Sequence, residues 1–325
     1  MRAAQVLDET VRYLSLRLVL APAAYLLPRS WALWLADALP VLLLVFPHTG
    51  TGLYWQMREV FGRGRLDSLK LALGWLGRGY RDFIINKRVV IGREDLFRWR
   101  IVERNADRIE ALRRSGESYI VACGHFGVAS GCAMLSPAVT WGHAVQVFGQ
   151  LPARSWNIRA LRLRYQAETF TIACCTAWRR RCELISSGPD DPGIETIYER
   201  LRERGNAVFI AVDMLGRRQT KTGSYERPFQ GLASRSFDLG AARLARLTGA
   251  PILSCVHWVE DDGTIVIEWG TPIRADEAAV LGEIGVMDAM LDRLEISIGD
   301  RPTHYAFEIG AARRWDPLAR QWTKR

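Results

Sequence analysis

An apolar run from Ser118 to Cys123 ends abruptly at Gly124, and His125 follows it. A short apolar run bounded by a glycine is typical of a buried strand. In an open α/β sheet, reactive side chains gather at the carboxyl edge, where the strands end. The stretch from Ser118 to Ser130 therefore predicts an active-site strand with His125 at its end. A histidine that merely caps a strand fits this stretch equally well, because a single motif is weak evidence.

A second strand-like run, from Asn206 to Val212, ends in Asp213. Helical and strand-like patterns alternate along the chain, which is the mark of an α/β sheet. We predict a mixed central sheet flanked by helices. Polar residues at two strand ends are the arrangement expected of an active site. The expected helices are 94–114, 126–137, 154–164, 193–204, 236–248 and 276–298, and the expected strands are 87–92, 118–123, 144–148, 169–174, 206–212, 251–258 and 264–269. A basic, glycine-rich loop is expected at 214–231, and an Asp-Asp-Gly turn joins the last two strands as a hairpin.

The first part of the chain differs in character from the rest. The apolar run Leu18–Leu27 is shorter than the roughly 20 residues that cross a bilayer. A second apolar helix, expected from an N-cap at Ser30 to Phe46, is interrupted by an aspartate and a proline, and residues 52–86 form a basic amphipathic region. We predict a hydrophobic and basic helical region at 1–90 that associates with a membrane, and an α/β domain at 91–325. Two helices that simply pack on the core are the alternative.

Net charge and cysteine spacing limit the classes of function that the chain could have. A net charge of +9 and a pI near 9.5 suit phosphate groups or a phospholipid surface, and equally suit nucleic acid. Zinc-finger spacing, an RNA-binding signature and a basic region leading into heptads are all absent from the sequence, so nucleic acid is not an expected partner. Six cysteines in no paired CxxC arrangement argue against a zinc site and a disulfide framework, and favour a cytosolic-side location. Cys123 as a nucleophile beside His125 is an alternative to a histidine base.

Several motifs follow one another along the chain. They are a hydrophobic N-terminus with Leu-Leu-Pro-Arg, His-Phe-Gly at a strand end, Arg154 opening a basic segment, Val-Asp213-x-x-Gly-Arg217, and Pro-Phe-Gln-Gly followed by Ala-Ala-Arg-Leu-Ala-Arg-Leu-Thr-Gly-Ala-Pro. In this order and rough spacing they resemble the bacterial lipid A late acyltransferases, the lauroyl and myristoyl transferase family of the lysophospholipid acyltransferase superfamily. The resemblance covers nearly the whole chain. It implies a glycerol-phosphate-acyltransferase-like fold and transfer of a fatty acyl chain to a membrane lipid, at the cytoplasmic face of the bacterial inner membrane.

The resemblance also implies roles for single residues. In the family's signature, a His is followed after four spacers by an acid that orients the imidazole, but Ser130 stands at that position here. His125 is then the general base, and Ser130 orients it only weakly because a hydroxyl carries no charge. Asp213 or another distant acid could supply the lost charge, Ser130 could serve an easier substrate, or the protein could bind lipid without catalysis. The residues expected to bind substrate, at a donor or acceptor phosphate or at the oxyanion, are Arg154, Asn157, Arg217 and Arg218.

We therefore expect a membrane-associated acyltransferase with an acyl thioester as co-substrate, and we expect neither a cofactor nor a metal. The expected partners are acyl carrier protein or acyl-coenzyme A, a lipid or glycolipid acceptor with a hydroxyl or amine, and the membrane surface. The alternative function is a non-catalytic homologue that binds lipid or acyl carrier protein and has lost the catalytic acid, with Ser130 in its place. The sequence lacks the Gly-x-Ser-x-Gly elbow of an α/β hydrolase.

Overall fold

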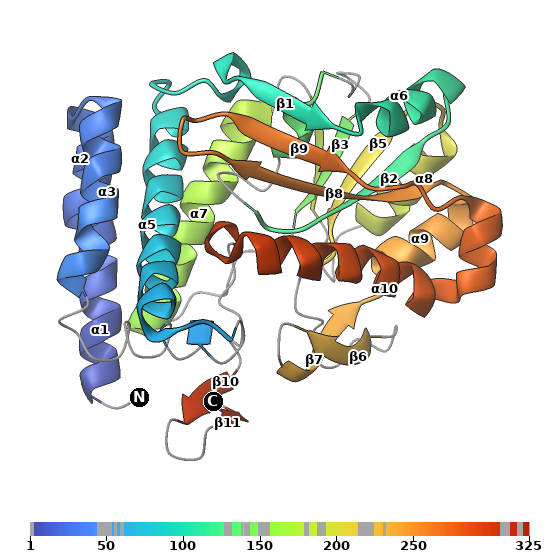
Figure 1. Cartoon of the computed structure of the whole chain (residues 1–325). Helices are drawn as coiled ribbons and strands as arrows, with labels where there is room; N and C mark the ends of the chain where they lie inside the picture. Colours follow the sequence, from blue (N-terminus) through green and yellow to red (C-terminus); the bar gives the residue numbers. More distant parts are fainter. Residues whose placement is uncertain are drawn as a thin grey trace.

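A seven-stranded mixed sheet forms the centre of the computed structural model, which describes residues 3–43, 54, 57–58, 62–126, 132–137, 139, 144–148, 157–178, 182–186, 193–213, 224–229, 232–305, 313–316 and 321–324. The strand order is β1-β9-β8-β2-β5-β3-β4 (Figure 1). The strands are β1 (Ile101–Arg104), β2 (Tyr119–Cys123), β3 (Ala144–Phe148), β4 (Glu183–Ser186), β5 (Ala207–Ala211), β8 (Ile252–Val259) and β9 (Ile265–Trp269). Strands β8, β2, β5, β3 and β4 run parallel, whereas β9 pairs antiparallel with β8 and parallel with β1. The predicted mixed α/β sheet flanked by helices is confirmed.

Helices bury both faces of this sheet. In β2, Ile120 and Ala122 pack into one apolar cluster, while Tyr119 and Val121 pack into the other, because side chains alternate along a strand. The first cluster is completed by α8 (Gly193–Arg202), α9 (Gly240–Thr248) and α10 (Ala275–Asp300), and the second by α5 (Arg65–Val90), α6 (Ala106–Ser115) and α7 (Ile158–Trp178). Burial on both faces explains why β2 and β5 read as unbroken apolar runs in the sequence.

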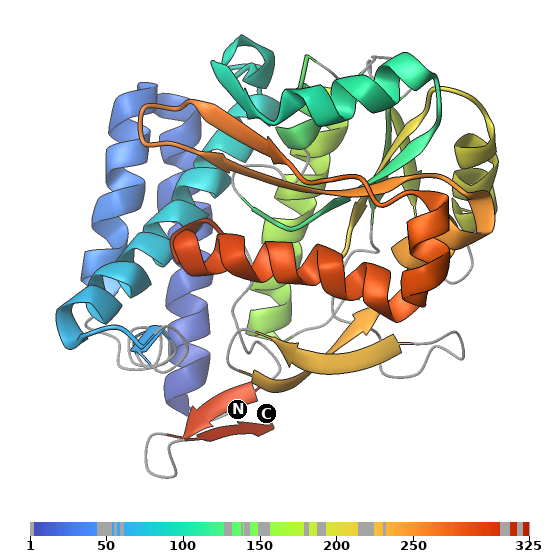
Figure 2. The same ribbon diagram turned by 45° about the vertical axis from the view of Figure 1, so that its right-hand side comes forward.

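The N-terminal helices form a further layer against α5 (Figures 1 and 2). They are α1 (Ala3–Leu14), the π-helical turn η1 (Ser15–Leu20), α2 (Ala21–Leu26) and α3 (Arg29–Leu43). Leu16 and Leu20 share a buried cluster with Phe83 and Ile84 of α5, whereas Ile85 of the same helix faces the sheet. Helix α5 is thus buried on two sides. Within the described part of the chain, no helix combines the length and the apolar character needed to cross a membrane.

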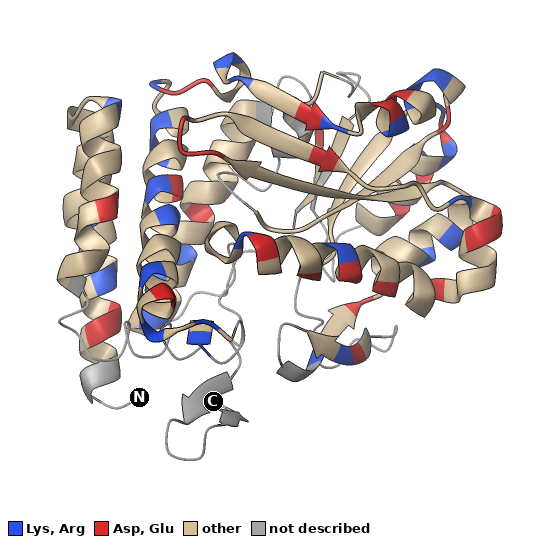
Figure 3. Cartoon of the chain, viewed as in Figure 1, with Lys and Arg blue, Asp and Glu red and all other residues tan. Residues whose placement is uncertain are grey.

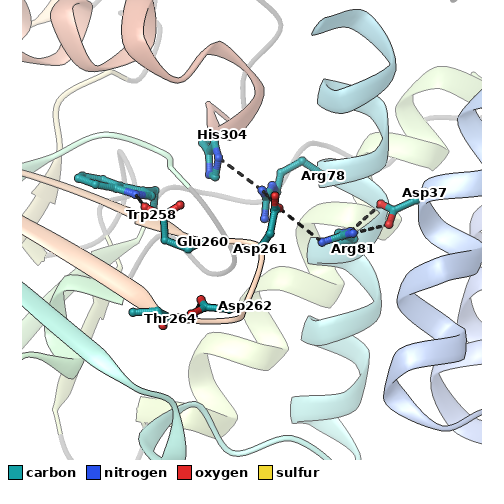
Figure 4. A network of polar contacts seen from close by, with 9 residues as sticks. All are labelled: Asp37, Arg78, Arg81, Trp258, Glu260, Asp261, Asp262, Thr264 and His304. Atoms are coloured by element: carbon teal, nitrogen blue, oxygen red, sulfur yellow. Dashed lines mark hydrogen bonds and ion pairs between the residues drawn. The ribbon is translucent and has the colours of Figure 1, made fainter. Parts of the chain in front are cut away.

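A polar network links α3 and α5 to the turn between β8 and β9 and to the short helix η4 (Pro302–His304), as Figure 4 shows. Arg81 donates to the Asp37 carboxylate of α3, with an Nε–Oδ1 distance of 2.6 Å. Arg78 lies 3.3 Å from the Asp261 carboxylate and 3.4 Å from His304 Nε2. Burial and the neighbouring Arg78 and Arg301 lower the pKa of His304 to about 3, so a neutral ring accepts the bond from Arg78. The segment before Tyr305 is therefore held against α5.

Several predicted elements are confirmed, with shifts of a few residues at their ends. These are the strands at 118–123, 144–148, 206–212, 251–258 and 264–269, with the antiparallel pairing of the last two, and the helices at 193–204 and 276–298. The helix expected at 154–164 is also present, as α7. From the helix expected at 126–137, the structure describes only a short 3-10 helix, η3 (Cys132–Leu135).

Three helix and strand assignments were wrong. The strand expected at 87–92 is the last turn of α5, and the strand expected at 169–174 lies inside α7. Both are short apolar runs, for which periodicity cannot separate a strand from a buried helix. The helix expected at 94–114 is instead a 3-10 turn, η2 (Leu96–Arg98), then β1 and α6, and Ser30 lies inside α3 rather than at its N-cap.

The second half of the expected loop at 214–231 is also corrected. Strands β6 (Ser224–Phe229) and β7 (Leu232–Asp238) form an antiparallel hairpin, so the helix expected from 236 begins only at Gly240 as α9. The remaining strands β10 (Arg313–Asp316) and β11 (Gln321–Lys324) pair with each other, and β4 was not predicted. The proposed division into regions 1–90 and 91–325 stays a prediction.

Gly270 provides a test of the β8–β9 packing. A Cβ added at this position would lie 2.1 Å from Ser254 Oγ and 3.0 Å from the Ser254 carbonyl oxygen. We predict that Gly270→Ala lowers the free energy of unfolding by about 1–3 kcal/mol in urea titrations. Gly79 is the matched control, because it lies in α5 and an added Cβ there would have no neighbour within 4 Å, and Gly79→Ala should raise that free energy by about 0.5–1 kcal/mol. Equal effects of the two substitutions would contradict this packing.

Candidate active site

His125 and Asp213 meet because of the register between β2 and β5. These strands are parallel neighbours, and Cys123 at the end of β2 is aligned with Ala211 at the end of β5. His125 and Asp213 each stand two residues beyond this aligned pair. The Val212 amide donates to the Cys123 carbonyl oxygen at 2.9 Å, which continues the pairing past the strands. The two polar strand ends that the sequence indicated therefore come together at the carboxyl edge of the sheet.

The Asp213 carboxylate holds both the ring and the backbone of His125. Its Oδ1 lies 2.6 Å from His125 Nδ1, and its Oδ2 accepts the His125 backbone N–H at 2.8 Å. The Asp213 side chain is fully buried, whereas the His125 side chain is 18% exposed. With a proton on Nδ1 shared with the carboxylate, Nε2 carries the lone pair that can accept a proton from a substrate. The arrangement is that of an acid that orients a general base.

The surroundings of Asp213 favour its ionised form. Burial opposes ionisation, but the His125 ring, the hydrogen bonds from His125 and the positive charge of Arg235 outweigh it and lower the pKa of Asp213. Arg235 Nη2 also donates to the Asp213 main-chain carbonyl oxygen at 2.6 Å. Burial and the nearby carboxylate raise the pKa of Tyr305 well above its usual value, so its hydroxyl keeps the proton with which it hydrogen-bonds the Asp213 side chain. Asp213 therefore carries its charge in a buried site.

Gly124 is needed for this close approach. A Cβ added at this position would lie 2.4 Å from Leu294 Cδ1 of α10 and 3.4 Å from Asp213 Oδ2. The next residue but one, Phe126, forms an isolated antiparallel bridge with Tyr305, and their ring centroids are 5.4 Å apart. A glycine thus lets the chain turn between α10 and the carboxylate, and Phe126 packs against Tyr305 in the segment after η4.

The other predicted site residues have different outcomes. Ser130, Arg154, Arg217 and Arg218 lie outside the described residues, so their proposed roles stay predictions. Asn157 precedes α7, and its Oδ1 accepts the Arg159 backbone N–H at 2.9 Å, which is an N-cap contact. Its predicted part in substrate binding is not tested. Asp213, which was one of the alternatives for supplying the charge missing from the His-x4-acid motif, does contact His125.

Two residues at the site were not predicted from the sequence. Arg235 falls between the loop expected at 214–231 and the helix expected at 236–248, and Tyr305 follows the last expected helix. For Arg235, the sequence offers only its position two residues before Phe237, which puts both side chains on the same face of a strand. Tyr305 has no such signal. It reaches the site through the packing of η4 against α5, where Trp75 Nε1 donates to the Tyr305 carbonyl oxygen at 2.9 Å.

Cys123 does not have the environment of a nucleophile. It is 1% exposed, and burial together with the Asp213 charge raises the pKa of its thiol to about 12. The thiolate is the reactive form of cysteine, so this alternative to a histidine base loses its support. In the described part of the chain, no group of three or more His, Cys, Asp or Glu residues is arranged to hold a metal ion.

Alkylation of the native chain tests whether the Cys123 thiol is unreactive. We predict that iodoacetamide at mildly alkaline pH leaves Cys123 unmodified while the half-buried Cys175 is carboxamidomethylated, as read by peptide mass spectrometry. The same reagent should modify both cysteines after unfolding in urea. Equal alkylation rates in the native chain would show that the Cys123 thiol is accessible and ionisable after all.

No protein-family model matches the chain, and no curated protein matches it. The proposals for its function therefore stand on the residues of the site, their geometry and the motifs described above.

Proposed function

We propose that this chain is a membrane-associated acyltransferase. It moves a fatty acyl chain from acyl carrier protein or acyl-coenzyme A to a hydroxyl, or an amine, of a lipid or glycolipid. The observation that carries the proposal is the 2.6 Å contact between His125 Nδ1 and the buried Asp213 carboxylate at the carboxyl edge of the sheet. This contact supplies the orienting charge that Ser130 cannot supply, and it supports a working site.

The reaction needs one base and no acyl-enzyme. His125 Nε2 accepts the proton of the acceptor hydroxyl while the hydroxyl oxygen attacks the carbonyl carbon of the thioester. The tetrahedral intermediate collapses when its C–S bond breaks, and the imidazolium gives its proton to the leaving thiolate. An acylated lipid and a free thiol result, and the imidazole is neutral again. Asp213 steadies the imidazolium between these steps, and the resemblance assigns the oxyanion or a phosphate to Arg154 and Arg217.

The N-terminal helices support membrane association. Large apolar side chains on α1, η1, α2 and α3 are exposed, including Leu18 at 67%, Leu26 at 78% and the neighbouring Trp31 and Trp34 at 63% and 64%. In Figure 3 the ribbons of these helices are mostly tan, with a few blue and red residues. Indole rings favour the interface between water and lipid, and a net charge of +9 favours an anionic surface. We assign this surface to the cytoplasmic face of a bacterial inner membrane.

A non-catalytic lipid- or carrier-binding protein is the second candidate. Ser130 at the family's acid position favours it, because the usual orienting carboxylate is absent from that motif. The two candidates differ in turnover. A binding protein would hold an acyl chain or acyl carrier protein without releasing a thiol from the donor.

Thiol release tests the transferase directly. The purified full chain is incubated with long-chain acyl-coenzyme A or acyl carrier protein, with and without a membrane lipid extract. We predict lipid-dependent thiol release that His125→Ala abolishes and Asp213→Asn lowers by about 10³- to 10⁴-fold. Asp238→Asn, which alters an exposed carboxylate beyond the site, should leave the rate unchanged. Full activity of Asp213→Asn, or acyl-chain binding with no release from any donor, would overturn the mechanism.

Vesicle binding tests the membrane surface separately. We predict that the double substitution Trp31→Ser and Trp34→Ser weakens co-sedimentation with anionic phospholipid vesicles at least about tenfold, because two exposed indoles leave the interface. Val280→Ser is the matched control, since this residue is 88% exposed but lies on α10, away from the N-terminal helices. Unchanged sedimentation of the double variant, or an equal loss with Val280→Ser, would remove this surface from the proposal.

A further inference from the structure

Arg235 is buried beside the candidate base, where its positive charge acts on Asp213. Its side chain comes from β7, the residue is 7% exposed, and its guanidinium carbon lies 4.9 Å and 5.0 Å from the ring centroids of Phe229 and Phe237. Its two terminal nitrogens point to the site, at 2.6 Å from the Asp213 carbonyl oxygen and 3.4 Å from the Tyr305 hydroxyl. Removing a charge from water costs free energy that burying an apolar residue would not, and the contacts with the two phenyl rings offset part of this cost.

The same hairpin contains an arginine with an ordinary structural role. Arg227 lies directly opposite Arg235 in the β6–β7 pairing, but it binds Asp288, Asp292 and Glu295 of α10. Its charge is balanced by three carboxylates on one neighbouring helix. Arg235 instead lies next to the buried carboxylate that contacts His125. Arg227 thus joins β6 to α10, whereas the charge of Arg235 acts on the site.

We propose that Arg235 and Tyr305 are positioning residues that make uptake of an extra proton by the His125–Asp213 pair less favourable, so that His125 is more available as a base. This inference rests on the function proposed above. A positive charge beside the pair makes uptake of a further proton less favourable, whichever of the two partners receives it. Without Arg235, the buried negative charge of Asp213 would hold that proton on the pair, and a protonated pair cannot accept a proton from an acceptor hydroxyl.

Tyr305 acts on the same carboxylate by hydrogen bonding. Its hydroxyl bonds the Asp213 side chain and lies 3.4 Å from Arg235 Nη1, so the three groups form a chain that ends at His125. Hydrogen bonds to a carboxylate favour its ionised form. The titratable or charged groups that act on Asp213 or lie against it include Cys123 of β2, Arg235 of β7 and Tyr305 after η4. Because the pKa of the Cys123 thiol is raised to about 12, this thiol is uncharged near neutral pH. Arg235 therefore contributes the positive charge among these groups.

Titration of His125 tests the inference with or without turnover. Histidine-labelled full-length chain is followed by NMR as pH changes, and the His125 signal is assigned by its loss in His125→Ala. We predict that Arg235→Met raises the titration midpoint by on the order of one pH unit, and that Tyr305→Phe raises it by less. Arg235→Lys keeps the charge and should return the midpoint toward that of the wild type. Arg227→Met, the matched control, should leave it in place.

The acid limb of the pH–rate profile for thiol release should move with the midpoint, to higher pH in Arg235→Met and back in Arg235→Lys. An unchanged midpoint in both Arg235→Met and Tyr305→Phe would overturn the inference, even if the wild type transfers acyl chains. A shifted midpoint in a chain that releases no thiol would support the electrostatic role and reject the transferase. If Arg235→Met does not fold, the titration midpoint of Tyr305→Phe tests the inference, with Arg235→Lys as the variant that keeps the charge. Both substitutions nearly keep the volume of the site.

Discussion

The buried carboxylate of Asp213 accepts both the backbone N–H and the ring Nδ1 of His125, and the organisation of the site depends on this contact. A charge with no exposed surface is costly unless several donors meet it. His125 and Tyr305 donate hydrogen bonds to this carboxylate, and Arg235 adds a positive charge beside it while donating to the Asp213 main-chain carbonyl oxygen. The three residues come from separate parts of the chain: the end of β2, the segment after η4, and the β6–β7 hairpin. The charge therefore fixes the position of elements that are distant in sequence, and it fixes the orientation of the one imidazole that they surround.

The register of the parallel strands β2 and β5 brings a distant carboxylate to His125, although Ser130 stands at the acid position of the His-x4-acid motif. In that motif the acid is close in sequence to the histidine, whereas Asp213 reaches the ring from the end of the neighbouring strand β5. Because Cys123 and Ala211 are aligned, equal steps beyond them bring His125 and Asp213 to the same point of the sheet edge. Gly124 permits the approach by leaving space for Leu294 and the carboxylate. A serine at position 130 is compatible with catalysis when the charge comes from β5.

Much of the scaffold could be predicted from the sequence, and the limits have physical causes. The strands that carry His125 and Asp213 are buried on both faces, so their apolar runs stand out, and their polar ends indicated the site. The run at 87–92 and the run at 169–174 are equally apolar, but helices α5 and α7 bury them, and a short run has no period that distinguishes the two cases. The β6–β7 hairpin was missed because its basic residues resemble a loop, although Arg227 is paired with carboxylates of α10 and Arg235 with the site. Tyr305 was missed because only tertiary packing through Trp75 brings it to Asp213.

The proposed chemistry requires that Asp213 orients His125 with its proton on Nδ1, which makes Nε2 the base. Nitrogen-15 NMR of the histidine-labelled chain measures this tautomer directly, with His125→Ala for assignment and Asp213→Asn as the perturbed variant. We expect a neutral ring protonated at Nδ1 in the wild type, and loss of this single tautomer in Asp213→Asn. A wild-type ring protonated at Nε2, or a tautomer that Asp213→Asn leaves unchanged, would contradict this role of Asp213.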